Sequence, residues 1–168
     1  MRHDEATTFL AKCMKEVHRD VEVGPTLLLL MGESFNHRSA NTEPDARVDI
    51  RCRGFWIDGQ SAFFDTRVFY PHAPSYRSKS LKSLYRRFEM DKKREYGERI
   101  REVEHGSFTP LVFSSCGGIG PEAKIAVSSL AAAMAERRDE PYSRVLHWLR
   151  CCLSFSLARS TIRCVHGS

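Results

Sequence analysis

The sequence has no regular cysteine framework, no hydrophobic leader and no long apolar run. Its six cysteines form no C-x-x-C pair, which argues against structural zinc and favours reduced thiols in an intracellular protein. The first residues, MRHDEATTF, lack the basic and apolar regions of a signal peptide. The run TLLLLM at residues 26–31 is far too short to cross a bilayer, so no membrane partner is expected.

The bulk composition is that of one ordinary globular domain. The 168 residues show no internal repeat, and contents of 42% hydrophobic and 28% charged residues argue against disorder. The 26 basic and 21 acidic residues give a net charge of +5. This surplus is compatible with a polyanion such as nucleic acid, and equally with a mildly basic soluble domain. We therefore expect a single domain over residues 1–168.

Hydrophobic periodicity predicts an α/β domain, in which helices flank a small mixed β-sheet. The expected elements are a helix over residues 3–19, a strand at 26–31, a hairpin of strands 47–56 and 61–70, a long charged helix over 78–104, a strand at 108–115, and helices over 121–137 and 141–165. The polar, turn-rich segment 32–46 is expected to be a mobile loop.

The second strand of the hairpin contains FFDTRVF, in which two charged residues interrupt an apolar segment. Asp65 and Arg67 are two residues apart and so share one face of the strand. Asp49 occupies the polar side of the first strand, and a hairpin can bring it beside Asp65. Two close carboxylates favour a shared cation such as Mg²⁺ or Mn²⁺, which suggests phosphodiester hydrolysis. The alternative is that each aspartate pairs with a neighbouring arginine, Arg51 or Arg67.

The long helix places a lysine on its apolar side. Phe88, Lys92, Tyr96 and Ile100 follow one another at steps of four residues and therefore lie on one face. A buried lysine is unfavourable unless it is paired, and a carboxylate cluster below Lys92 would pair it. The alternative is that Lys92 extends its ammonium group to solvent. A small rotation of the helix would put Lys93 in the same place.

These motifs resemble the restriction-like endonuclease domain of retrotransposons, which belongs to the PD-(D/E)XK nuclease superfamily. The resemblance spans residues 2–167 and rests on RHDE, GPTLLLL, ARVDI, FFDTRV and KKREY in this order. ARVDIRCRGFW, FFDTRVFYPHAPSY and EHGSFTPLVFSSCGG also look like segments of retroelement-derived proteins. The resemblance implies a restriction-endonuclease-like core and a Mg²⁺- or Mn²⁺-dependent DNA endonuclease in the nucleus. It also implies that the chain is the carboxy-terminal part of a larger reverse-transcriptase polyprotein.

The resemblance implies roles for individual residues. Asp49 and Asp65 match the two metal-binding acidic residues, and Glu5 matches an accessory glutamate that some members direct at the metal. Lys92 and Tyr96 match a catalytic lysine and a tyrosine four residues later.

Other positions depart from the pattern or extend it. Arg67 stands where the parent motif has its strand lysine, and a guanidinium there is suited to clamp a phosphate. Asp45 belongs to a literal Pro-Asp pair, but strand alternation favours Asp49 instead. The zinc-knuckle cysteines that usually precede RHDE are missing. The residues expected to contact DNA are Arg2, Arg67, Lys79, Lys82 and Lys93, three of which lie in or beside the basic segments RSKSLKSLYRR and KKR.

Three alternatives stay open from the sequence. The turn SSCGGIG contains Cys116, which with His105 or His147 would form a nucleophile–base pair. The chain is alternatively a catalytically inactive nucleic-acid-binding relic of the same fold. The apolar last helix either packs on the sheet or forms a homodimer.

Overall fold

The computed structural model describes the backbone of residues 4–166 and the side chains of residues 5–163. Four strands form one mixed sheet in the order β1-β2-β3-β4: β1 (Val21–Val23), β2 (Ile50–Arg53), β3 (Ser61–Phe69) and β4 (Ser107–Ser114). The pairs β1–β2 and β2–β3 are antiparallel, whereas β4 runs parallel to β3. The predicted hairpin is thereby confirmed as β2 and β3, although β2 is shorter than expected.

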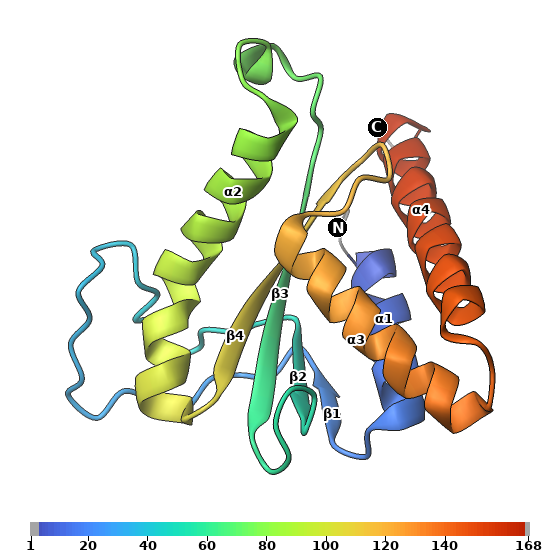
Figure 1. Cartoon of the computed structure of the whole chain (residues 1–168). Coiled ribbons are helices and arrows are strands. Elements are labelled where there is room, and N and C mark those ends of the chain that lie inside the picture. The colour runs from blue at the N-terminus through green and yellow to red at the C-terminus, as the bar shows by residue number, and fades with distance from the viewer. Residues whose placement is uncertain (1–3, 167–168) are drawn as a thin grey trace.

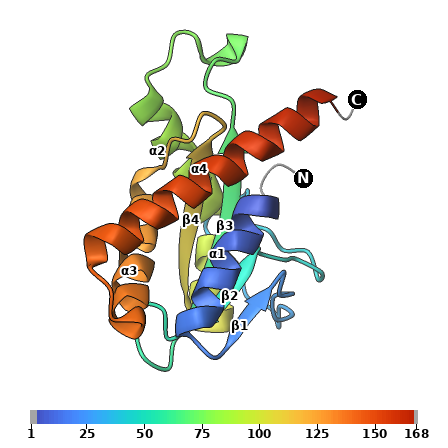
Figure 2. The same ribbon diagram turned by 90° about the vertical axis from the view of Figure 1, so that its right-hand side faces the viewer.

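Helices cover both faces of this sheet (Figure 1). On one face lies α2 (Leu81–Lys92), preceded by the 3-10 turn η1 (Pro74–Tyr76) and continued by the π-helical segments η2 (Lys93–Gly97) and η3 (Ile100–Glu104). On the other face lie α1 (Asp4–Val17), α3 (Pro121–Arg138) and α4 (Tyr142–His166). Figure 2 shows α4 as the outermost element of this second layer, crossing over α1 and α3. The predicted α/β class with a mixed sheet is confirmed.

Successive side chains of β3 point to opposite faces of the sheet and so contribute to the core on both faces. Ala62 and Phe64 point into the larger cluster, which α1, α3 and α4 close. Phe63 joins the cluster with Tyr96, and Phe69 joins the cluster under α2. Because Phe64 is completely buried, truncating it to alanine is expected to cost about 3–5 kcal/mol.

The predicted strand at residues 26–31 is wrong. Only Thr26 makes a strand-like bridge, to Arg47, and the actual first strand is β1, just before Gly24. Side chains rather than a neighbouring strand satisfy the backbone of Leu28: its N–H donates to Glu104 and its carbonyl accepts from Arg99. Leu28, like Leu29 and Met31, exposes more than half of its surface.

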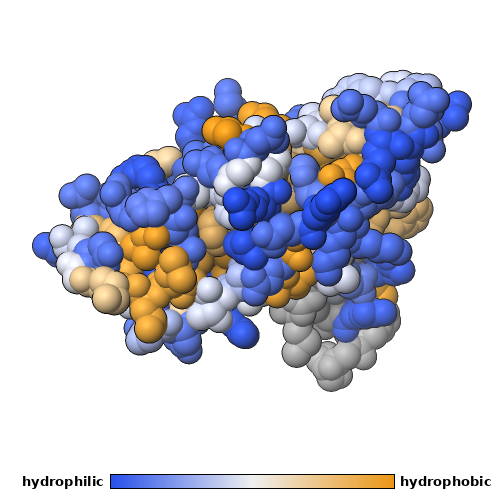
Figure 3. All heavy atoms as spheres, turned by 90° about the horizontal axis from the view of Figure 1, so that it is seen from below, coloured by the Kyte–Doolittle hydropathy of each residue, from blue (hydrophilic) through white to orange (hydrophobic). Residues whose placement is uncertain are grey.

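Seen from below, the molecule shows separate apolar patches within a mainly hydrophilic surface (Figure 3). Within the described chain, no helix has the length and apolar character needed to span a membrane.

The segment 32–46 is irregular, as predicted, but it is tied to the end of the long helix. Asn36 donates its backbone N–H to Glu98 at 2.8 Å, and Asn41 donates its own to the carbonyl of Glu95 at 2.8 Å. The fully buried Arg99 donates to the carbonyls of Asn41 and Glu43 at 2.9 and 2.8 Å. The mobility of this segment stays a prediction. These hydrogen bonds act against it, because they tie the segment to the helix.

Candidate active site

The end of the β2–β3 ladder brings the two predicted aspartates together. The antiparallel ladder ends at the pair Ile50–Phe64, and Asp49 and Asp65 are the adjoining residues of the two segments at that end. The backbone N–H of Asp49 donates to the carbonyl of Phe64 at 3.1 Å. Its carboxylate accepts the N–H of Thr66 at 2.7 Å. The backbone of β3 therefore holds the Asp49 side chain at the strand that carries Asp65.

Lys92 reaches down from α2 to the carboxylate of Asp65. Its Nζ lies 2.6 Å from Oδ2 of Asp65 and 3.7 Å from Oε2 of Glu95. The side chains of Lys92 and Asp65 are only 18% and 9% exposed, so water screens this pair weakly. The predicted proximity of Lys92 to Asp65 is confirmed, and the alternative in which Lys92 extends its ammonium group to solvent does not hold in this structure.

The surroundings of Asp65 oppose its ionisation. Burial and then the charge of Asp49 raise the pKa of Asp65, and Lys92 opposes both effects, so that the pKa is about 6. One lysine therefore does not supply all the positive charge that two carboxylates demand here.

Tyr96 and Arg67 frame this acidic pair. Tyr96 is buried against the ring of Phe108, and the Lys92 ammonium lies 5.7 Å from its ring centroid. Burial, followed by the charges of Asp65 and Glu95, raises the pKa of Tyr96, which keeps its hydroxyl protonated. Arg67 lies over the ring of Phe88, at 4.1 Å from the centroid, on the Asp65 face of β3.

The remaining predicted residues lie elsewhere. Glu5 is bound to α4, with its carboxylate 2.5 Å from Arg163 and 3.6 Å from Arg159. Lys93 pairs with Glu122 at 2.5 Å rather than with the aspartates, which distinguishes it from Lys92. Lys79 and Lys82 are exposed before and within the first turn of α2, Asp45 is exposed in the loop, and Arg2 falls outside the described residues.

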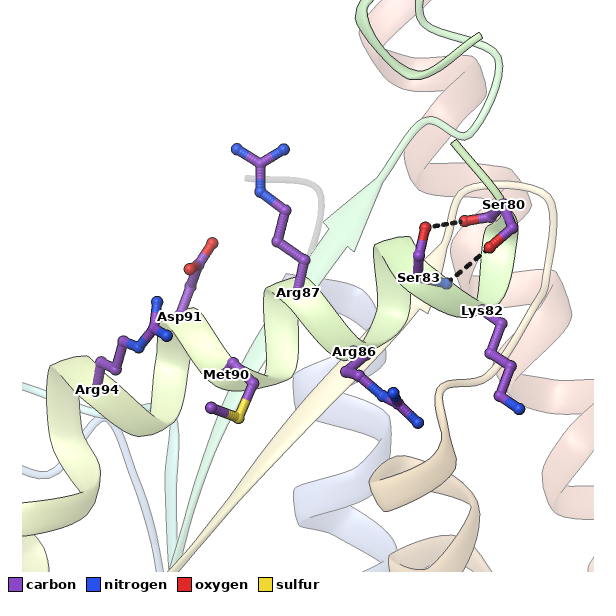
Figure 4. Close-up of a pocket in the computed structure, with 8 residues that line it drawn as sticks. All are labelled: Ser80, Lys82, Ser83, Arg86, Arg87, Met90, Asp91 and Arg94. Carbon is purple, nitrogen blue, oxygen red and sulfur yellow. Dashed lines mark hydrogen bonds between the residues drawn. The ribbon is translucent and has the colours of Figure 1, made fainter. Parts of the chain in front are cut away.

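The outer face of α2 carries a shallow basic hollow of about 560 Å³. Its lining residues are Ser80, Lys82, Ser83, Arg86, Arg87, Met90, Asp91 and Arg94 (Figure 4). The side chain of Ser80 caps the helix by accepting the N–H of Ser83 at 3.2 Å. Helical spacing sets this face opposite the stripe that contains Lys92, so the hollow is separate from the acidic pair. Lys82 was predicted individually to contact DNA, whereas Arg86, Arg87 and Arg94 were identified only as members of basic segments.

Glu89 is a buried acidic residue that the sequence analysis missed. It is 7% exposed, and its Oε1 has no hydrogen-bond partner among the described atoms. Burial and then the charge of Glu122 raise the pKa of Glu89. Its position on the buried side of α2, one turn before Lys93, was the available signal, since 85, 88, 89 and 92 share one side of a helix.

The alternative cysteine nucleophile finds little geometric support. Cys116 is exposed in the turn after β4 and shares a hollow of about 620 Å³ with His147. The contact of the His147 ring is with Cys151, whose Sγ lies 3.6 Å from Nε2. His105 closes the long helix with a left-handed backbone, at a φ of 54°.

Two negative findings complete the description of the site. In the part of the chain that the structure describes, no three His, Cys, Asp or Glu side chains converge as a metal cluster, so Glu5 does not join Asp49 and Asp65. The sequence matches no protein-family model and no curated protein.

Proposed function

We propose that the chain is a metal-dependent DNA endonuclease with a restriction-endonuclease-like core. The observation that carries this proposal is the ion pair between Lys92 and Asp65, with Asp49 just before the adjacent strand and bonded to the backbone of β3. The chain order of one helix, three antiparallel strands, a long helix and a parallel fourth strand supports it. Retroelement origin, a polyprotein context and a nuclear location remain expectations from the resemblance.

The residues at the β2–β3 end fit a divalent cation. Mg²⁺ commonly binds through one or two carboxylates, with water and substrate phosphate completing its shell, so two aspartates are sufficient. The raised pKa of Asp65 indicates that the site favours additional positive charge. Asp49 and Asp65 would hold Mg²⁺ or Mn²⁺, which supplies water activation and neutralises phosphate charge when bound.

The side chains around this pair have distinct tasks in the proposed reaction. Lys92 provides a fixed ammonium that stabilises negative charge as it develops on the phosphate. Tyr96 limits the movement of Lys92 through its buried ring. Arg67 keeps guanidinium donors for a phosphate oxygen while Phe88 holds its plane. The Thr66 N–H maintains the orientation of the Asp49 carboxylate.

The basic face of α2 would contact the DNA backbone away from the cleaved bond. Lys82, Arg86, Arg87 and Arg94 are exposed on that face. Since such contacts are with phosphates, the proposal predicts binding without strong sequence preference from this helix.

A plasmid-nicking assay with Mg²⁺ or Mn²⁺ tests the proposal. Asp49→Asn and Asp65→Asn should each abolish nicking while the circular dichroism spectrum remains that of the parent. Asp45→Asn is the matched control, because Asp45 belongs to the literal Pro-Asp pair but is exposed in the loop. Nicking by Asp49→Asn at the parent's rate would refute the assignment. DNA binding without nicking, unchanged by Asp65→Ala, would instead identify an inactive nucleic-acid-binding relic.

A further inference from the structure

Helix α4 has two apolar faces, of which the fold buries one. The second takes part in the fold near its start, where the Trp148 ring lies 5.7 Å from the Phe9 ring and 4.7 Å from the Arg138 guanidinium. Val145, Leu149, Leu153 and Leu157 are buried against the rest of the molecule. On the opposite side, a second apolar stripe consists of Trp148, Cys151, Phe155, Ala158 and Ile162, at alternating steps of three and four residues. This is the spacing with which one helix packs along another. We call these five residues the outer stripe.

The outer stripe is exposed along most of its length, with Cys151 half-buried. Phe155 and Ile162 expose 69% and 56% of their surface, and Trp148 exposes 38%. Figure 2 shows why, because α4 is the outermost element of its layer and its carboxy-terminal end projects beyond the body. Large side chains exposed along one line of a helix mark an interaction surface more often than single exposed residues do.

A hollow beside the stripe gives this surface depth. It has a volume of about 620 Å³ and lies between α4 and the turn after β4, where Cys116 and Gly117 form its other wall. Cys151, Phe155 and Ala158 line the hollow as well as the stripe. A side chain from a partner therefore has an apolar pocket to enter, which is how helical ligands anchor in grooves.

The charge of α4 indicates what kind of partner fits. Residues 142–166 contain no aspartate or glutamate, and Arg144 and Arg150 are exposed on this helix. The arginines nearer its carboxy-terminal end, Arg159 and Arg163, pair with Glu5. We propose that the outer stripe binds an amphipathic helix of a partner protein that carries acidic residues beside its apolar face.

Two other occupants fit these observations less well. A second copy of the chain would bring arginines against arginines along α4, because that helix has no acidic residue to offer. A membrane surface favours a broad apolar face that inserts as a whole, whereas the outer stripe is one residue wide and has a pocket at its side. The stripe from residue 148 to residue 162 is about 21 Å long, the length of a partner helix of about four turns.

Trp148 offers a direct measurement of this binding. The sequence contains two tryptophans, so Trp56→Phe leaves Trp148 as the only one. The probe is a synthetic helical peptide with leucines at heptad spacing flanked by glutamates. Its titration should shift the Trp148 emission to shorter wavelength with saturation. A peptide of the same composition in scrambled order should not shift it.

Matched variants decide whether the outer stripe is responsible. Phe155→Glu and Arg150→Glu should each weaken peptide binding at least tenfold. Leu29→Glu introduces the same charge at a residue that is 62% exposed on a different part of the molecule, and it should bind like the parent. Circular dichroism checks that each variant is folded.

Three outcomes would overturn the proposal. One is equal binding of the ordered and scrambled peptides. Another is a dimer of the protein alone that Phe155→Glu dissociates, which would assign the stripe to a second copy. The third is binding to phosphatidylserine vesicles, abolished in Phe155→Glu, without binding of the peptide.

Discussion

The Lys92 ammonium, 2.6 Å from the Asp65 carboxylate, ties helix α2 to an inner strand of the sheet. Each charge is largely removed from water, so each depends on the other for compensation. Asp65 needs this compensation most, because Asp49 adds a second negative charge beside it. The pair therefore connects stability with the proposed chemistry.

Replacing Lys92 with methionine should leave the Asp65 carboxylate without its cation. We expect the free energy of unfolding to fall by about 3 kcal/mol at pH 8, as for other broken buried ion pairs. Adding Asp65→Asn to Lys92→Met should recover most of this decrease, since it removes the unpaired charge. Urea denaturation measures both effects.

Lys93→Met is the control. The side chain of Lys93 is 45% exposed in its pair with Glu122, so this variant should lower the free energy of unfolding by less than about 1 kcal/mol. Equal destabilisation by the two lysine variants would contradict this account.

The raised pKa of Asp65 predicts how stability depends on pH in the metal-free protein. The pKa moves from an ordinary value of 3.8 to about 6 on folding, so the folded state binds the proton more tightly. The free energy of unfolding should therefore decrease as pH rises from about 4 to 6, by on the order of 3 kcal/mol from this group. Urea denaturation in EDTA across this range measures the slope.

Asp65→Asn should remove this decrease, whereas the exposed Asp45→Asn should keep the parent's pH dependence. If Mg²⁺ binds the ionised pair, adding it at pH 7 should stabilise the parent but not Asp65→Asn. A parent protein whose stability rises between pH 4 and 6 through Asp65 would contradict the assignment of the raised pKa.

The parts of the fold that were predicted correctly depend on local periodicity. The alternation of the apolar residues Val48, Ile50 and Cys52 with charged residues predicts the strand that contains β2, and all three are buried in the structure. The failure at residues 26–31 has a tertiary cause. An apolar run becomes a strand only where a neighbouring backbone continues to pair with it. Here that pairing stops after Leu27, whose N–H donates to the Ala46 carbonyl, and the side chains of Arg99 and Glu104 bind the backbone of Leu28 instead.

The residues of the candidate site likewise fall into those that local periodicity identifies and those that it does not. Lys92 was identifiable because it falls on the apolar stripe of a clear helix, and Asp65 because it interrupts a clear strand. Arg99 and Glu89 were not identified, although both are buried. The burial of Arg99 depends on carbonyl groups from distant segments, about which periodicity along one helix carries no information. Helical spacing does place Glu89 on the buried side of α2, but it does not reveal that Glu122 approaches it from α3.

Arg99 should control the order of the segment 32–46. Arg99→Met keeps the buried volume similar but removes charged hydrogen bonds to three carbonyls, so we expect the free energy of unfolding to fall by more than about 3 kcal/mol. Hydrogen exchange across residues 32–46 should become faster, and trypsin should cleave earlier at Arg38. Arg101→Met is the control, because Arg101 is 67% exposed and should change stability by less than about 0.5 kcal/mol. Unchanged exchange in Arg99→Met would show that other interactions hold the segment.

The basic face of α2 should contribute to DNA affinity through charge alone. In the triple variant Lys82→Gln, Arg86→Gln, Arg87→Gln, the slope of log K against log salt should decrease by about 2 to 3, because each DNA phosphate that the protein neutralises contributes about 0.9 to this slope. Fluorescence anisotropy with a labelled duplex measures the slope. Cleavage at saturating DNA should remain at the parent's rate, because these side chains face away from Lys92.

A control of equal net charge separates a specific face from general attraction. Lys12→Gln, Lys15→Gln and Arg137→Gln remove three exposed charges from the opposite layer of the molecule, on α1 and α3. This variant should retain most of the parent's slope, since DNA bound along α2 would be more than a Debye length from those residues at physiological salt. Equal effects of the two triple variants would mean that net charge, rather than the face of α2, determines binding.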